Sequence, residues 1–94
     1  MFEWDERKAA ANAAKHGVTF DDAVTVFVDA NALDGPDLAH SAAEPRYLRL
    51  GAAADGRVLM VAYTIWRRAN VETVRLISAR CASRRERAAY RAQH

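Results

Sequence analysis

The first third of the chain has the apolar spacing of two helices. Residues 5–16 are rich in alanine, with Asp5 placed to cap the start and Gly17 placed to end the helix. In residues 19–27, Thr19 stands three positions before Asp22, as in a capping box. Apolar residues then recur at the i, i+3, i+4 and i+7 positions of one helical face, at Phe20, Ala23, Val24 and Phe27.

The middle of the chain changes to strand-like patterns. Residues 29–45 have the composition of a loop, with at most one short strand near 32–33, and the runs 46–53, 58–66 and 71–80 read as strands. Asp55-Gly56 and residues 67–70 separate these runs as turns, so the pattern predicts two hairpins.

The end of the chain returns to helical spacing, because Ser83 and Glu86 repeat the capping-box pattern before residues 87–93. The whole pattern predicts an α+β fold. We expect two N-terminal helices, a three- to four-stranded antiparallel sheet and a C-terminal helix, with the helices on one face of the sheet and the other face available to a ligand.

The 94 residues are enough for one domain, so residues 1–94 are interpreted as a single unit. The N-terminal residues are charged from Glu3 onward and precede no apolar run, which predicts neither a secretion signal nor a membrane span. The single cysteine, Cys81, cannot form an internal disulfide, and we expect a small packed side chain there. These features predict a cytoplasmic protein.

Charge is unevenly distributed along the chain. Residues 1–45 carry nine acidic and three basic side chains, whereas residues 46–94 carry three acidic side chains and eleven arginines. Because the guanidinium group matches phosphate bidentately and stacks on bases, this bias favours contact with a polyanion. A genome that favours arginine and alanine codons would explain the number of arginines, though less well their clustering.

Lys8, Asn12 and His16 form one stripe on the first predicted helix, since they are spaced four residues apart. Such a row could bind RNA, with the lysine contacting a phosphate, the amide contacting a sugar hydroxyl and the imidazole transferring a proton. The alternative interpretation is structural: His16 closes the helix C-terminus, where the helix dipole favours its cation, and Asn12 is solvated.

The predicted strands carry a second group of candidates, namely Arg46, Arg49, Arg75 and Arg80. Strand alternation places Arg46 on the face opposite Arg49, so these arginines cannot all serve one site. Arg75 lies among apolar positions and needs a partner, for which Glu44 and Glu72 are candidates. Arg80 ends its strand beside the last helix, where it could meet a phosphate.

The third group is the basic face of the C-terminal helix, formed by Arg84, Arg87 and Arg91. It is suited to following a phosphate backbone, or it is an ordinary solvated face. The sequence lacks the motifs of the common duplex-reading proteins, so sequence-specific DNA recognition is not the favoured interpretation. No group of His, Asp and Glu has the spacing of a metal site, and no cofactor is expected.

Over nearly its full length the chain resembles the BrnT family of type II toxins. The resemblance rests on the order and spacing of several short stretches: Phe2-Glu3-Trp4-Asp5 with Lys8, Asn12 and Lys15-His16-Gly17-Val18 with Phe20 and Ala23, Asp37 with His40, Glu44 through Arg46 with Gly51, and Arg75-x-Ile77-Ser78-Ala79-Arg80 with Glu86 and Tyr90. The turn formed by residues 66–71 is not typical of that pattern.

The resemblance implies a RelE-like fold, an RNA-cleaving activity that arrests translation, and a BrnA-type antitoxin that carries the DNA-binding function. It favours functional roles for six residues: Lys8, His16, Glu44, Arg46, Arg75 and Arg80. Our hypothesis assigns proton transfer to His16 or Glu44 and phosphate binding to the three arginines, in a transesterification that needs no metal. The alternative is a non-catalytic module that binds RNA or docks a partner on the same fold.

Overall fold

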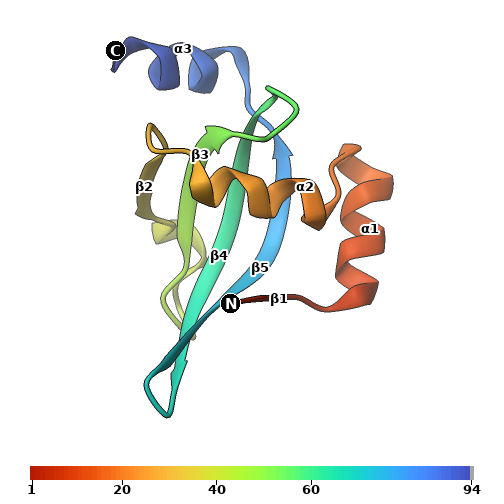
Figure 1. The fold of residues 1–94 in the computed structure, drawn as a ribbon, viewed down its shortest axis with the longest axis vertical. Helices are drawn as coiled ribbons and strands as arrows, with labels where there is room; N and C mark the ends of the chain where they lie inside the picture. Colours follow the sequence, from red (N-terminus) through yellow and green to blue (C-terminus); the bar gives the residue numbers. More distant parts are fainter. Residues whose placement is uncertain (94) are drawn as a thin grey trace.

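A five-stranded mixed sheet forms the centre of the computed structural model, which describes residues 1–93 (Figure 1). The strands lie in the order β1-β5-β4-β3-β2. β1 runs parallel to β5, and the remaining neighbours are antiparallel. The strands are β1 (Phe2–Glu3), β2 (Leu33–Pro36), β3 (Tyr47–Ala52), β4 (Val58–Arg68) and β5 (Val71–Cys81).

The sequence patterns predicted the α+β class, the two hairpins and the approximate limits of β3, β4 and β5, all of which are confirmed. The prediction of three to four strands, all antiparallel, is wrong, because the sheet has five strands and β1 is parallel to its neighbour β5. β1 was missed because two residues are too short to show a strand period, and the strand exists only by pairing Phe2 with Val74 and Glu3 with Arg75. The RelE-like description stays a prediction.

Helices flank the sheet where the capping residues predicted them. Asp5 accepts from the backbone of Arg7 and Lys8 at the start of the first helix, and Gly17 ends it in the left-handed region with φ 68°. The segment expected as one helix over residues 19–27 is a short α-helix followed by a 3-10 turn. The helical elements are α1 (Glu6–His16), α2 (Phe20–Val24), η1 (Thr25–Val28), η2 (Leu38–His40) and α3 (Arg84–Ala92).

The main core lies between one face of the sheet and the N-terminal helices. In Figure 1, α2 and η1 cross in front of the sheet while α1 stands beside β5. Alternate residues of β4 (Leu59, Val61 and Tyr63) point to this face and pack against buried side chains of the 18–26 segment. Burial of these side chains from both layers is the main source of stability, at about 25 cal/mol per Å² of apolar surface.

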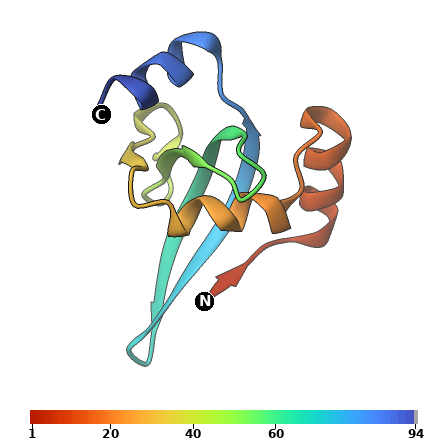
Figure 2. The same cartoon turned by 45° about the horizontal axis from the view of Figure 1, so that its top comes forward.

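The helix α3 packs on the opposite face, at one end of the sheet, so the expectation that every helix covers the same face is wrong. Tyr90 of α3 contacts Leu50 and Val58, in a second, smaller core. Its hydroxyl donates to Asp29 at 2.6 Å. Both views draw α3 apart from α1 and α2 (Figures 1 and 2). Of the helices described, neither α1 nor α2 covers the rest of this face, and a pocket forms there.

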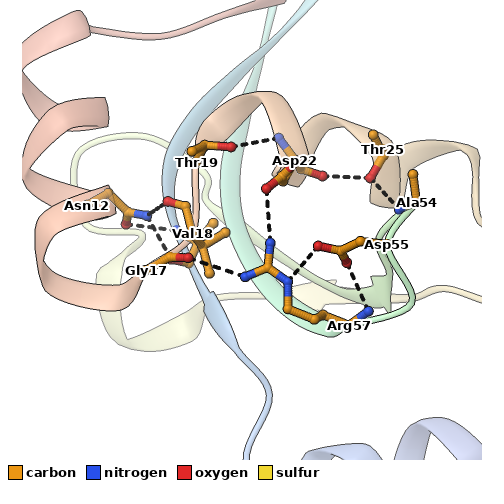
Figure 3. Close-up of polar contacts among 10 residues, drawn as sticks. Asn12, Gly17, Val18, Thr19, Asp22, Thr25, Ala54, Asp55 and Arg57 are labelled. Atoms are coloured by element: carbon orange, nitrogen blue, oxygen red, sulfur yellow. Dashed lines mark hydrogen bonds and ion pairs between the residues drawn. The ribbon is translucent and has the colours of Figure 1, made fainter.

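Arg57, in the turn between β3 and β4, ties that turn to the junction of α1 and α2 (Figure 3). Its guanidinium donates to the carbonyl of Gly17 at 3.2 Å and to the carboxylates of Asp22 at 2.9 Å and Asp55 at 2.8 Å.

The expectation of a packed Cys81 is wrong, because its side chain is exposed. No helix within residues 1–93 is both long enough and apolar enough to cross a membrane.

Candidate functional site

A pocket of about 340 Å³ opens on the sheet face that α1 and α2 leave free. We call it the sheet-face pocket. Three neighbouring strands and the η2 segment contribute its lining, which consists of Asp37, His40, Arg46, Leu48, Met60, Ala62, Ile77, Ser78 and Arg80. A histidine, a carboxylate and two arginines therefore converge over an apolar floor.

The strand register explains why these residues meet. Ala62 of β4 pairs with Leu48 on one side and with Ser78 on the other, and Met60 pairs with Arg80. The ladder slips between Ala62 and Tyr63, where a bulge in β5 inserts Ile77 as an extra residue. Such a bulge redirects the side chains that follow it, and here it brings the end of β5 to the pocket wall.

His40 and Asp37 form a hydrogen-bonded pair at the pocket. The Nδ1 atom of His40 lies 3.1 and 3.2 Å from the two carboxylate oxygens of Asp37. Since an ionised carboxylate only accepts, this contact places a proton on Nδ1 and leaves Nε2 as the nitrogen that can take one up. The Asp37 side chain is 12% exposed and that of His40 is 65% exposed, so the carboxylate is sheltered and the imidazole is accessible.

The loop that carries this pair is fastened to the start of β3. The Ser41 hydroxyl donates to the carbonyl of Asp37 at 2.7 Å and accepts from the backbone N–H of Arg46 at 3.0 Å. The N–H of Asp37 in turn donates to the carbonyl of Arg46 at 2.8 Å. These bonds fix His40 relative to Arg46 and give the loop a defined geometry beside the sheet.

The two pocket arginines differ in how they are held. Arg80 forms a bidentate ion pair with Glu86, with N–O distances of 2.7 and 2.9 Å, and the same carboxylate completes the capping box of α3 with Ser83. The guanidinium is the main cause that lowers the pKa of Glu86 to about 2. Among the described residues, no carboxylate lies within ion-pair distance of Arg46, so its charge is free to meet an anion.

A second depression adjoins the sheet-face pocket along the edge of β5. We call it the α1 depression. It shares Ile77 and Ser78 with the pocket, and α1 supplies the rest of its lining, namely Lys8, Ala11, Asn12, Lys15 and His16. The structure therefore places the predicted Lys8 and His16 next to the predicted Arg46 and Arg80 without putting all four in one cavity.

Asn12, the middle of the predicted stripe, has a structural role and is not solvated. Its side chain is buried and faces the junction of α1 with the sheet (Figure 3). The amide nitrogen donates to the carbonyls of Val18 at 3.0 Å and Ala79 at 2.8 Å, while its oxygen accepts from the N–H of Ala79 at 3.0 Å. The side chain thus takes the place of a neighbouring strand where β1 has ended.

Glu44 and Arg75 lie on the sheet face that carries the pocket, but farther along the hairpin of β4 and β5. The carboxylate of Glu44 accepts from Nε1 of Trp66 at 3.3 Å. Neither Glu44 nor Glu72 pairs with Arg75, contrary to expectation, because β1 brings Glu3 beside it at 3.4 Å. The structure places Glu44 and Arg75 at Trp66 and not among the residues that line the pocket.

The predicted helix arginines do not converge on the pocket either. Arg87 and Arg91 line a separate depression with Arg57 and Cys81, near the turn of β3 and β4. Arg87 donates to the carbonyl of Ala82 at 2.7 Å, which caps a backbone acceptor at the end of β5. Arg84 lines neither this depression nor the sheet-face pocket.

Sequence reasoning assigned no role to Asp37 or His40, although both belong to the stretches that carry the family resemblance. Their spacing of three residues in a loop after Pro36 was the available signal, since it allows a carboxylate to hold an imidazole. Within residues 1–93, no three His, Cys, Asp or Glu side chains are grouped so as to hold a metal ion.

Comparison with known proteins places these features in context. The model of a protein family described as "Ribonuclease toxin, BrnT, of type II toxin-antitoxin system" matches residues 4–86. The structure is similar to the crystal structure of the Brucella abortus ribonuclease toxin BrnT, with a TM-score of 0.63 and 28% sequence identity over 89% of this chain and 99% of that chain. No curated protein matches the sequence.

Proposed function

The chain belongs to the BrnT family of ribonuclease toxins of type II toxin–antitoxin systems, and we propose that it cleaves RNA in the sheet-face pocket without a metal ion. The observation that carries this proposal is the meeting of the Asp37–His40 pair with Arg46 and Arg80 in one accessible pocket. Together they offer a proton acceptor and two phosphate-binding cations, which are the groups that transesterification of RNA requires.

In the proposed reaction, Nε2 of His40 takes the proton from the ribose 2′-OH as that oxygen attacks the adjacent phosphorus. Asp37 holds the imidazole by its Nδ1 proton and stabilises the cation that forms. Arg46 and Arg80 hydrogen-bond to the phosphate oxygens as negative charge builds on them. The bond from phosphorus to the 5′-oxygen breaks, which leaves a 2′,3′-cyclic phosphate and a 5′-hydroxyl.

The leaving 5′-oxygen needs a proton, and we assign its delivery to His16. This residue lies in the α1 depression, which adjoins the pocket through Ile77 and Ser78. Lys8 in the same depression adds a positive charge for the departing strand. A protonated His16 and an unprotonated His40 then exchange their states in one turnover, as a general acid–base pair does.

The family implies an antitoxin as partner, and we propose that it is of the BrnA type and neutralises the toxin by covering this basic surface. RNA cleavage would arrest translation in the cytoplasm, where the substrate lies. We propose that contact with DNA is indirect, through the antitoxin.

The test is cleavage of a labelled RNA by the purified protein, with products identified by mass. We expect a cyclic phosphate product, activity that persists in EDTA, and a loss of about 10²–10⁴-fold for His40→Ala. Arg67→Gln is a matched control, because Arg67 is exposed on the opposite face of β4 and pairs with Glu72. Full activity of His40→Ala would refute the site. RNA binding without any cleavage by the wild-type protein would favour the non-catalytic module instead.

A further inference from the structure

A cluster of aromatic and charged side chains occupies the free sheet face beyond the sheet-face pocket. Successive even-numbered residues of β4 share this face, so the row that begins with Met60 and Ala62 in the pocket continues through the buried Thr64 to Trp66 and Arg68. The neighbouring strand β5 adds Arg75, and the segment before β3 adds Glu44. We call the four residues Glu44, Trp66, Arg68 and Arg75 the Trp66 cluster.

The indole of Trp66 is held in a defined orientation within this cluster. The guanidinium carbons of Arg75 and Arg68 lie 5.0 and 5.2 Å from the ring centroid, and the Glu44 carboxylate accepts from Nε1 at 3.3 Å. The side chain remains partly exposed. A large aromatic ring is thus fixed near solvent with two guanidinium groups over it, and it is not buried in either core.

The charges of the cluster favour an anionic ligand with flat groups. Arg75 is paired with Glu3, but within residues 1–93 no carboxylate lies within ion-pair distance of Arg68. Proteins bind single-stranded nucleic acid with aromatic rings that stack on bases and with basic side chains that meet the phosphates. At Trp66, a base would take the place of a guanidinium over the indole, and that arginine would move to a phosphate.

We propose that the Trp66 cluster is a base-stacking subsite for a single strand of RNA that runs from the sheet-face pocket along β4. This inference rests on the proposed function, because it places the cleaved phosphate in the pocket. Trp66 lies four positions after Ala62, which corresponds to about 13 Å along a strand. A stacked strand advances about 3.4 Å per nucleotide, so the subsite binds a base no more than about four nucleotides from the cleaved bond.

The subsite makes a specific demand on the substrate: an RNA that is too short to reach Trp66 loses this contact. Stacking on an aromatic side chain changes binding by roughly 5- to 150-fold per base. We therefore expect the wild-type protein to cleave a decanucleotide with a kcat/KM at least about fivefold higher than that for a dinucleotide of the same cleaved step. Trp66→Leu should reduce this ratio toward one, whereas Trp66→Phe should retain part of it.

Arg68 and Arg67 form a matched pair for the electrostatic part of the test. They are adjacent in β4 but lie on opposite faces, and Arg67 pairs with Glu72. Arg68→Gln should weaken binding of the decanucleotide. It should also lower the slope of log Kd against log salt concentration by about 0.7, which corresponds to one lost phosphate contact. Arg67→Gln should change neither quantity.

Binding is measured separately from cleavage in a His40→Ala background that also carries Trp4→Phe. Trp4 packs on Phe20 on the other side of the sheet, so Trp66 becomes the only indole in the described part of the chain. Stacking of a base on Trp66 should quench its fluorescence as the decanucleotide is added. Thermal unfolding of each variant shows that it is folded.

Three results would overturn the subsite: equal decanucleotide-to-dinucleotide ratios for wild type and Trp66→Leu, no quenching at saturating RNA, or an effect of Trp66→Leu confined to neutralisation by the antitoxin. The last result would assign the cluster to protein docking. If the wild-type protein cleaves neither oligonucleotide but Trp66 is quenched, the proposed catalytic function fails while the RNA subsite stands.

Discussion

Replacement of Asn12 by alanine tests whether this residue is a structural replacement for a missing strand or a ligand-binding group. In the structure, the buried amide of Asn12 bonds to the carbonyl and N–H of Ala79 at the edge of β5 and to the carbonyl of Val18 between α1 and α2. Only one orientation of the amide serves all three, with its NH₂ toward the carbonyls of Val18 and Ala79 and its oxygen toward the N–H of Ala79.

The magnitude follows from the groups left without partners. A buried polar group that loses its hydrogen bond costs about 1–3 kcal/mol, so Asn12→Ala should lower the free energy of unfolding by at least about 3 kcal/mol. For a domain of this size, each kcal/mol corresponds to about 4–8 °C in Tm, which gives a fall of at least about 12 °C. Arg7→Ala is the control, because Arg7 is exposed on the same helix and should change stability by less than about 0.5 kcal/mol.

Asn12→Asp adds a test by pH. The aspartate keeps the acceptor for Ala79 N–H but turns an anionic oxygen toward two carbonyls, so its pKa in the folded state should be raised above the unfolded value. Because the folded state then binds the proton more tightly, the variant should gain stability relative to wild type as the pH falls from 7.5 to 4.5.

The assay is urea unfolding followed by circular dichroism at the two pH values, with RNA cleavage measured below the transition. A loss of less than 1 kcal/mol for Asn12→Ala would refute the structural role. Loss of cleavage with unchanged stability would instead restore the interpretation in which Asn12 contacts the substrate.

Three further predictions concern stability. Glu86→Gln should lower the free energy of unfolding by about 1–2 kcal/mol at pH 7, after allowance for solvent screening of the partly exposed Arg80. The pKa of Glu86 is lowered to about 2, so its contribution is fully present above about pH 4.5 and is lost as the pH falls toward 2; a pH-independent difference between wild type and variant would contradict this. Thr64→Val should be neutral or stabilising by up to about 1 kcal/mol in thermal unfolding, because the buried hydroxyl of Thr64 has no hydrogen-bond partner among residues 1–93, and a clear loss would show that a partner exists. Gly51→Ala should cost about 1–3 kcal/mol in urea unfolding, since the added Cβ would lie 3.1 Å from the Cβ of Ala32, and unchanged stability would mean that the neighbouring segment yields.

The parts of the fold that local chemistry determines were predictable from the sequence. Helix caps at Asp5, Thr19 and Ser83 act through bonds to residues two or three positions away, so the sequence pattern contains the whole interaction. Strand alternation likewise predicted that Arg46 and Arg49 face opposite sides. Arg46 lines the pocket, while Arg49 pairs with Asp34 on the other face.

The parts that depend on distant segments were not predictable. β1 needs Val74 as its partner, and Asn12 needs Ala79, so neither role leaves a periodic signal near its own position. The bulge at Ile77 is also invisible in the sequence, yet it helps to form the wall shared by the pocket and the α1 depression. The proposed site therefore depends on the parts of the fold that local patterns describe least.

The pairing of Arg80 with Glu86 separates two tasks that the arginine-rich second half of the chain was expected to combine, namely direct binding of a phosphate and attraction of RNA over longer distances. Both terminal nitrogens of Arg80 donate to the Glu86 carboxylate, so the ion pair as a whole has no net charge. The N–H groups that this carboxylate leaves free can still donate to a phosphate, but the pair adds little attraction over longer distances. Attraction over longer distances must come from cations that have no carboxylate partner within the described part of the chain. Of these, Arg46 lines the sheet-face pocket, and Lys8 and Lys15 line the α1 depression. The helix α3 thus contributes to the proposed site through its acidic cap, Glu86, while its Arg87 and Arg91 line a separate depression.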